Sequence, residues 1–164
     1  MKYSLVDSDD PILHKKTEDL DFTNPSIDPI QFAKDIAEAV NEYKGLGLAA
    51  NQIGVGISCF VVKAGESMMV FYNPKVVSYS ESSLYMDEGC LTYPGLIIKV
   101  KRPESIRLRY TLPNGEVETK KFSGMTSRII QHEMEHLEGK RFYSKATSYH
   151  REQGFKKWKK MLRA

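Results

Sequence analysis

The sequence is organised around residues 131–139, Gln131-His132-Glu133-Met134-Glu135-His136-Leu137-Glu138-Gly139. This stretch contains H-E-x-x-H, which on a helix sets two imidazoles one turn apart on the same face, with a carboxylate beside them. Apolar residues recur at near-helical intervals from Met125 to Leu137 and predict a helix over residues 124–139, with Gly139 placed to end it. Such a spacing is typical of a metal site in which the glutamate handles the proton of a metal-bound water. The remaining ligand must come from elsewhere in the chain.

That ligand could be a carboxylate, a histidine or a thiolate, and Cys90 is the strongest candidate. It lies in residues 86–95, among glycines and other turn formers. Beside a dication its thiol would be deprotonated, and a His2Cys set would leave one coordination position for water. His14 and His150 lie outside any supporting motif and are interpreted as surface histidines. H-E-x-x-H also occurs by chance, and the two histidines would then be exposed polar groups of a helix.

Length and composition predict one globular domain over residues 1–164. Hydrophobic residues make up 41% of the chain and charged residues 27%, and no apolar run is long enough to span a bilayer. The first residues turn acidic before a signal-peptide core could form, so we expect a cytoplasmic protein in a reducing compartment. A disulfide between Cys59 and Cys90 is therefore not favoured. Cys59, in a strand-like run, is interpreted as a small buried apolar side chain.

Turn and cap signals divide the chain into elements. Residues 1–28 are expected to be irregular, and a helix follows with Asp28 as N-cap and Gly45 at its end. The further expected elements are strands 57–62 and 68–72 as a hairpin, a turn at Asn73-Pro74, a strand within 75–85, a hairpin of 105–111 with 117–122, and a helix over 147–164.

The C-terminal stretch is amphipathic and basic. Phe155, Trp158 and Met161 alternate with lysines and arginines. The interpretation we favour is a helix docked on the domain, with its cationic face in water. The alternative is contact with ribosomal RNA, which would be sensitive to salt. The net charge of +3 over the whole chain does not indicate specific DNA binding.

Three stretches occur in order along the chain: Gly45-Leu46-Gly47-Leu48-Ala49-Ala50-Asn51-Gln52, Glu88-Gly89-Cys90-Leu91-Thr92 and Gln131-His132-Glu133-Met134-Glu135-His136. They resemble the three motifs of the peptide deformylases, G-x-G-x-A-A-x-Q, E-G-C-L-S/T and Q-H-E-x-D/E-H. The resemblance spans residues 28–142. It implies an α+β fold in which antiparallel β-sheets surround a central metal-binding helix, with an N-terminal helix and a short C-terminal helix. It also implies removal of the formyl group from N-formylmethionine at the start of new polypeptides.

The resemblance also implies roles for individual residues. By this resemblance the metal ligands are expected to be Cys90, His132 and His136, and Glu133 is expected to be the general base and acid. The side chain of Gln52 and the backbone N–H of Leu91 donate to the developing oxyanion. A formamide polarised by a metal and two fixed donors is open to attack by metal-bound hydroxide, so the chemistry supports these roles.

The methionine side chain of the substrate needs an apolar pocket. The expected walls are Leu46, Met86, Met125 and Ile129, although some of these could be plain core residues. Gly47 and Gly89 are expected to place backbone groups against the extended substrate. Glu88 is expected to orient a neighbour, with a salt bridge to Arg102 as one arrangement.

Two positions depart from the common deformylase pattern. Glu135 stands where most relatives have Asp, and this longer carboxylate could change a contact behind the ligands. Ile97 stands where many relatives carry an arginine that meets the substrate backbone. The way in which this chain holds the peptide beyond methionine is therefore a separate question from the reaction.

The identity of the metal is indicated more by the family resemblance than by the types of ligand. A His2Cys set suits zinc, whereas the deformylases characteristically use ferrous iron, Fe(II), which nickel or cobalt can replace. The expected partners are N-formylmethionyl peptides, with no membrane partner, and we expect a monomer. The expected site of action is a bacterial or host-cell cytoplasm, with an organelle left open. The rival functions are a zinc metallopeptidase and a metal-binding protein without turnover.

Overall fold

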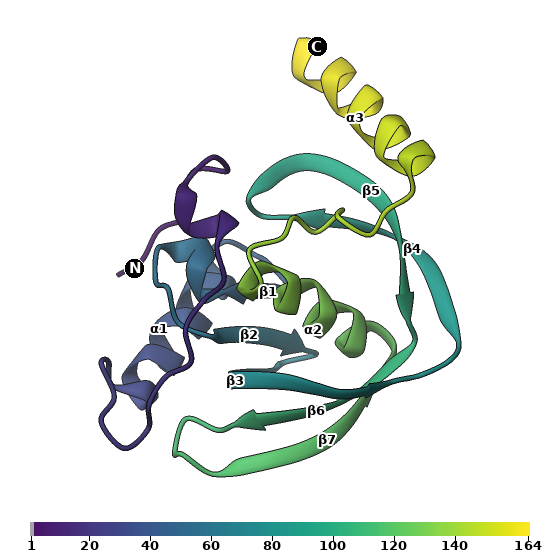
Figure 1. Ribbon diagram of the computed structural model, residues 1–164. Helices are drawn as coiled ribbons and strands as arrows, with labels where there is room; N and C mark the ends of the chain where they lie inside the picture. The colour runs from purple at the N-terminus through teal and green to yellow at the C-terminus, as the bar shows by residue number, and fades with distance from the viewer. Residues whose placement is uncertain (1) are drawn as a thin grey trace.

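The computed structural model describes residues 2–164, which form helices and antiparallel strands. The helices are η1 (Pro11–His14), α1 (Pro29–Glu42), η2 (Ala50–Ile53), α2 (Gly124–Leu137) and α3 (Ser148–Arg163). The strands are β1 (Gly47–Ala49), β2 (Cys59–Ala64), β3 (Ser67–Tyr79), β4 (Ser83–Cys90), β5 (Tyr93–Pro103), β6 (Ser105–Thr111) and β7 (Val117–Ser123). One sheet has the order β1-β2-β3-β6-β7, and β4 pairs with β5 in a second sheet. Both sheets curve around α2 (Figure 1), which confirms the expected α+β arrangement.

Helix α1 begins where its cap signal predicts. The Asp28 carboxylate accepts hydrogen bonds from the N–H groups of Ile30 (3.0 Å) and Gln31 (3.3 Å), and Pro29 occupies the first helical position. Its apolar side chains are buried in the core together with residues of β1 and β2. This packing places the loop after α1, and therefore β1, beside α2.

The predicted turn at Asn73-Pro74 is wrong, because β3 continues through it. Asn73 adopts a left-handed conformation (φ 48°), and the register with β6 shifts between Tyr72 and Lys75. The Asn73 side chain exchanges two 2.8 Å hydrogen bonds with the backbone of Leu20, which fixes this irregularity inside the strand. The strand expected within residues 75–85 is consequently divided between β3 and β4.

The second sheet carries a strand that the sequence did not predict. In β5 the buried residues Leu96, Ile98 and Val100 alternate with exposed Ile97 and Lys99. The predicted hairpin of β6 and β7 is confirmed, with Thr111 opposite Val117. Cys59 is buried in β2, and both cysteines are free thiols.

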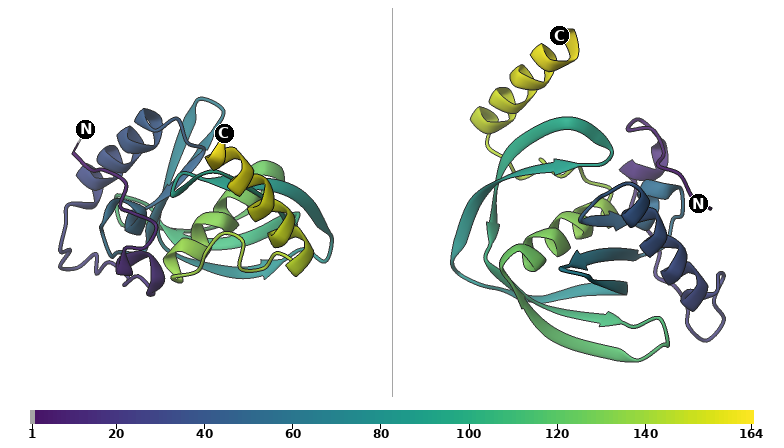
Figure 2. Two further views of the ribbon diagram at one scale, coloured as in Figure 1. Left: turned by 90° about the horizontal axis from the view of Figure 1, so that it is seen from above. Right: turned by 180° about the vertical axis from the view of Figure 1, so that it is seen from behind.

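The central helix α2 is buried along most of its length and ends at Leu137. Gly139 follows in a left-handed conformation (φ 77°), and a Cβ there would lie 2.7 Å from the backbone of Lys15. Thr147 caps α3, which packs beside β5 at the edge of the molecule (Figure 2). Across residues 2–164, no helix has the length and apolar character needed to cross a membrane.

Candidate metal centre and active site

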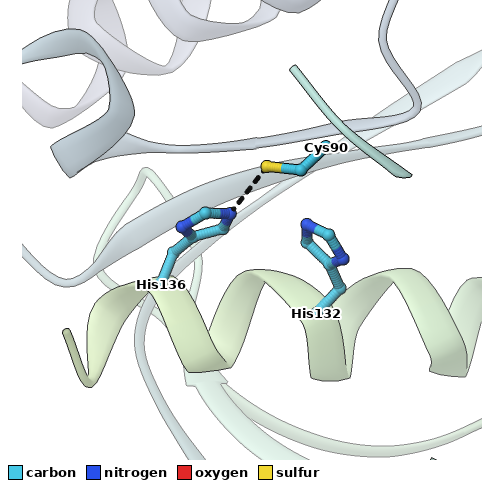
Figure 3. Close-up of side chains that lie close together, drawn as sticks. All are labelled: Cys90, His132 and His136. Carbon is cyan, nitrogen blue, oxygen red and sulfur yellow. Dashed lines mark hydrogen bonds between the residues drawn. The ribbon is translucent and has the colours of Figure 1, made fainter. Parts of the chain in front are cut away.

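Three ligand atoms converge between α2 and the end of β4. The Cys90 Sγ and one ring nitrogen each from His132 and His136 all lie within 4.8 Å of one another. Cys90 Sγ lies 3.2 Å from His136 Nε2. Figure 3 shows both imidazoles rising from one face of α2 toward the sulfur atom. The structure thus brings together the three residues that the sequence singled out as ligands.

Local structure explains this convergence. The spacing of four residues places both histidines on one face of α2, one turn apart. Cys90 is the last residue of β4, where the register with β5 shifts after Glu88 and Cys90 pairs with Tyr93. This irregularity ends the strand over the histidine face of α2.

The charges around the cluster fit a divalent cation. Burial by itself would raise the pKa of the Cys90 thiol, but the imidazoles of His136 and His132 lower it well below its usual range. Burial likewise opposes a charge on His132, yet Glu133, Cys90 and Glu88 raise its pKa well above the ordinary value. Glu133, Cys90 and Glu88 therefore favour positive charge at the position of His132. One thiolate and two imidazoles are also ligands that zinc and iron accept.

Glu133 lies beside the histidines and is almost fully buried. Within residues 2–164 its Oε1 atom has no hydrogen-bond partner. Burial raises the pKa of its carboxyl, and this effect outweighs the opposing influence of His132 and His136. The backbone of Gly47 lies so close that a Cβ there would be 2.6 Å from Glu133 Oε2. One carboxylate oxygen is therefore free to bind a proton-bearing group.

Gln52 is held in η2 with its amide directed at the cluster. Its Oε1 accepts from the Ala49 N–H at 2.9 Å, and its Nε2 donates to Thr92 Oγ1 at 2.9 Å. The same Nε2 lies 3.5 Å from Cys90 Sγ. Leu91 lies in the two-residue turn between β4 and β5, next to Cys90. The sequence reasoning missed Thr92 as a partner of Gln52, although the motif that contains Cys90 includes it.

A cavity of about 500 Å³ opens beside these groups. Gln52, Cys90, Leu91, His132 and Glu133 all line it. The predicted substrate-binding residues Leu46, Gly47, Gly89, Met125 and Ile129 line it as well. Leu46 and Met125 are 58% and 50% exposed, so they contribute apolar surface to the rim of this buried site.

Met86 is the exception among the predicted wall residues. It does not line the cavity and instead lies on β4 opposite Val100. Each residue advances a strand by about 3.3 Å, so four residues carry Met86 about 13 Å away from Cys90. The motif position placed it near the catalytic stretch in sequence, but the extended strand separates the two in space. Ile97 occupies the cavity wall instead.

Comparison with known proteins decides the family. The model of the polypeptide deformylases matches residues 2–152. The chain belongs to the polypeptide deformylase family. It is 36% identical over 140 residues to the peptide deformylase of Caldanaerobacter subterraneus subsp. tengcongensis, which covers 85% of this chain and 86% of the relative. It is 34% identical over 152 residues to peptide deformylase 1B, chloroplastic/mitochondrial, of Arabidopsis thaliana, which covers 87% of this chain and 54% of the relative.

Solved structures agree with this assignment. A crystal structure of peptide deformylase from Plasmodium falciparum matches with a TM-score of 0.86 and 30% identity, covering 98% of this chain and 95% of that one. The protein is therefore an enzyme, a hydrolase of N-terminal protein processing whose family removes the formyl group from nascent polypeptides. The deformylase family is metal-dependent, and the group of Cys90, His132 and His136 could hold one metal ion.

Behind the ligands, this deformylase carries a buried network of charges around Glu88. Glu88 Oε1 lies 3.1 Å from His132 Nδ1, and Arg102 donates to Glu88 from Nε at 2.6 Å and from Nη2 at 2.9 Å. Arg128 Nη1 donates to the same carboxylate at 2.6 Å. Burial opposes the charged form of Glu88, but the bonds from His132 and Arg102 lower its pKa to about 2. The expected salt bridge with Arg102 is confirmed, and the contact with His132 is consistent with the expected orienting role of Glu88, whereas Arg128 was not anticipated.

Glu135 and Asn51 extend this support of the deformylase site. The Glu135 carboxylate accepts from Arg102 Nη1, and it accepts from Ser144 Oγ at 2.8 Å. Arg102 is only 1% exposed and lies between two carboxylates. Asn51 Nδ2 donates to the backbone carbonyl of His136 at 2.6 Å, a contact that the sequence did not signal. The longer carboxylate of Glu135 thus ties α2 to the segment that precedes α3.

Proposed function

We propose that this protein hydrolyses the N-formyl group of N-terminal formylmethionine on nascent polypeptides and releases formate. In this proposal Cys90, His132 and His136 hold one divalent metal ion. The observation that supports it is that Cys90 and His132 of this cluster line one cavity together with the Gln52 amide and with Glu133, whose Oε1 has no hydrogen-bond partner within residues 2–164.

The proton steps are assigned to Glu133. A divalent metal ion in the site supplies Lewis acidity, which polarises a carbonyl group and makes water more acidic. Glu133 would accept a proton from the attacking water and pass it to the amine nitrogen as the C–N bond breaks. The products are formate and a free methionine amino group. The free Oε1 atom of Glu133 and its raised pKa support this role.

The negative charge that develops on the formyl oxygen requires hydrogen-bond donors. We assign this role to Gln52 Nε2 and the backbone N–H of Leu91. Gln52 is already fixed by its bond from Ala49, so its amide needs little reorganisation to reach a substrate oxygen. Thr92, which now accepts from Nε2, would share or release this bond when substrate enters.

Recognition of the methionine side chain is assigned to the apolar part of the cavity. Leu46, Met125 and Ile129 supply flexible or branched apolar surface next to Glu133. An unbranched thioether packs well against such side chains. Gly47 and Gly89 would allow the substrate backbone to come close, since neither carries a side chain.

One assay separates the rival functions. The metal-loaded protein is incubated without oxygen with a formyl-Met peptide, with the matching acetyl-Met peptide and with an unmodified peptide. We expect formate and a free amine from the formyl peptide alone. Cleavage of internal bonds would support a metallopeptidase, and the absence of formate from fully metallated protein would overturn the proposal.

We assign Fe(II) as the working metal, with Zn, Ni or Co as substitutes. A thiolate-bound ferrous ion is sensitive to oxygen, so the iron form should lose activity in air while the nickel or cobalt form keeps it. Full activity in a preparation that contains zinc alone would contradict the iron assignment.

The setting of the reaction is part of the proposal. Formylmethionyl chains emerge from bacterial and organellar ribosomes, and the relatives include a chloroplastic/mitochondrial enzyme. We place the protein in a bacterial or host-cell cytoplasm or in an organelle, and we expect it to be a monomer. The lysine-rich face of α3 would then be available to ribosomal RNA. Co-sedimentation with ribosomes that does not fall as salt is raised would contradict this electrostatic contact.

A further inference from the structure

Helix α3 packs directly against the backbone of β5. Gly154 is the buried residue of this helix, and a Cβ there would lie 2.7 Å from the Ile97 carbonyl oxygen and 2.5 Å from Ile98 Cγ1. Only a glycine allows this approach without displacing the strand. The helix therefore lies against the strand whose residue Ile97 lines the cavity.

The last turns of α3 hold the first residues of β5. Trp158 Nε1 donates a 2.9 Å hydrogen bond to the carbonyl oxygen of Pro94. Gly95 has a left-handed conformation (φ 83°), and a Cβ there would lie 2.0 Å from Met161 Cε, so the Met161 side chain covers this glycine. Residues 94–97, which we call the β5 lip, all line the cavity that contains the candidate metal ligands.

A second contact connects α3 to the same site. The ring centroids of Trp158 and Phe155 are 6.0 Å apart, and those of Phe155 and Tyr143 are 5.2 Å apart. The ring centroids of Tyr143 and Phe142 are 5.2 Å apart. The Phe142 ring in turn stacks on the imidazole of His132, with 5.4 Å between the two centroids. Helix α3 thus contacts the surroundings of the site in two ways, through β5 and through the aromatic rings that lead to His132.

We propose that α3 is a positioning element for substrate binding, in which Trp158 and Met161 fix the β5 lip. This inference rests on the proposed function, because the lip matters only if the peptide substrate enters this cavity. None of the groups assigned to the chemical step lies on the lip. Loosening the lip therefore weakens the binding of the peptide that follows formylmethionine and leaves the chemical step unchanged.

The variants are Trp158→Phe, which removes the indole N–H donor and keeps a smaller aromatic ring at this position, and Met161→Ala. The matched control is Leu162→Ala, because Leu162 is a neighbouring apolar residue that is 64% exposed. Loss of one net hydrogen bond corresponds to about five-fold in affinity. We expect the KM for a formyl-Met tripeptide to rise about five-fold in Trp158→Phe and also to rise in Met161→Ala, with kcat unchanged in both. Leu162→Ala should match the wild type.

Hydrogen–deuterium exchange gives a readout independent of activity. The amides of Tyr93 and of residues 95–97 should exchange faster in both variants than in wild type or Leu162→Ala, whereas those of α2 should not change. Unchanged KM together with unchanged exchange would overturn the proposal, as would a fall in kcat at constant KM, which would indicate an effect through His132. A wild-type protein that releases no formate would overturn the proposed function instead, and the exchange data would still show whether α3 fixes the lip.

Discussion

Gln52 illustrates how neighbouring residues can hold one side chain ready for a reaction. Its carbonyl oxygen is fixed by the Ala49 N–H, so the NH2 group points at Thr92 and the sulfur of Cys90. One preorganised donor to an oxyanion is worth about 3 kcal/mol of barrier. Gln52→Ala should therefore lower kcat at least about a hundred-fold while metal content stays stoichiometric. Formate release and metal analysis of the purified variant test this expectation.

Thr92→Val is the matched control for Gln52. It removes the present acceptor of the amide but leaves the Ala49 contact intact, so its loss of turnover should be much smaller. Near-normal turnover by Gln52→Ala, or an equal loss in both variants, would exclude a direct donor role for Gln52.

Arg102 has the most demanding electrostatic environment of the site. It is buried between Glu88 and Glu135, and removing it leaves two carboxylates without their shared partner. Breaking a buried pair from one side typically costs 3–5 kcal/mol, so Arg102→Met should lower the free energy of unfolding by about that amount. Because Glu88 contacts His132, metal affinity should fall by about ten-fold or more.

The comparison for Arg102 is an exposed ion pair. Lys75 and Asp19 are 3.2 Å apart and both largely exposed, so Lys75→Ala should change the unfolding free energy by less than about 1 kcal/mol. Urea denaturation of both variants measures the difference. Equal small effects would mean that the Arg102 network contributes little to stability.

At the residue scale, residues inside recognisable motifs could be predicted from the sequence, whereas residues that only folding brings to the site could not. The ligand set, Glu133 and Gln52 follow from spacing and resemblance. Arg128 and Asn51 serve the site from positions whose residue types carry no signal in an isolated sequence. Met86 was assigned to the pocket because it adjoins a motif, but an extended strand places it away from the cavity.

The approach of β1 to α2 fixes the position of Glu133. Gly47 in β1 faces Glu133 and Ile129, and a Cβ there would lie 2.6 Å and 2.7 Å from their side-chain atoms. Gly47→Ala should displace the carboxylate and lower kcat more than about ten-fold, because a misplacement of about 1 Å can cost a hundred-fold. Gly56→Ala serves as control, since its Cβ would meet only ordinary van der Waals contact at 4.0 Å. Wild-type kcat in Gly47→Ala would contradict the assigned geometry.

Elements with strong local signals were predictable and those set by tertiary contacts were not. The N-cap and proline at Asp28-Pro29 locate the start of α1, and Asn114-Gly115 locates the hairpin of β6 and β7. The Asn73-Pro74 pair carries the residues of a turn, but bonds to distant Leu20 make it an irregularity inside β3. Strand β5 contains proline and glycine at its start, which hid its alternating pattern.

The whole molecule combines two sheets and a buried helix with α3 docked at the edge. We propose that residues 1–164 form one cooperative unit that includes α3. The single tryptophan of the chain, Trp158, lies in α3 and reports on its docking. Urea unfolding followed by its fluorescence and by far-UV circular dichroism should give coincident transitions. A fluorescence transition at lower urea would show that α3 detaches before the remainder unfolds.

In the proposed reaction, one metal site and Glu133 together remove the formyl group. The most direct measurement is formate release from a formyl-Met peptide by wild type and by Glu133→Gln, both metallated without oxygen and with metal content determined. General acid–base catalysis contributes typically 10²–10⁴-fold. We expect rapid formate release by wild type and a loss of at least about a hundred-fold in a Glu133→Gln variant that keeps its metal. Equal rates in the two metallated proteins would contradict it.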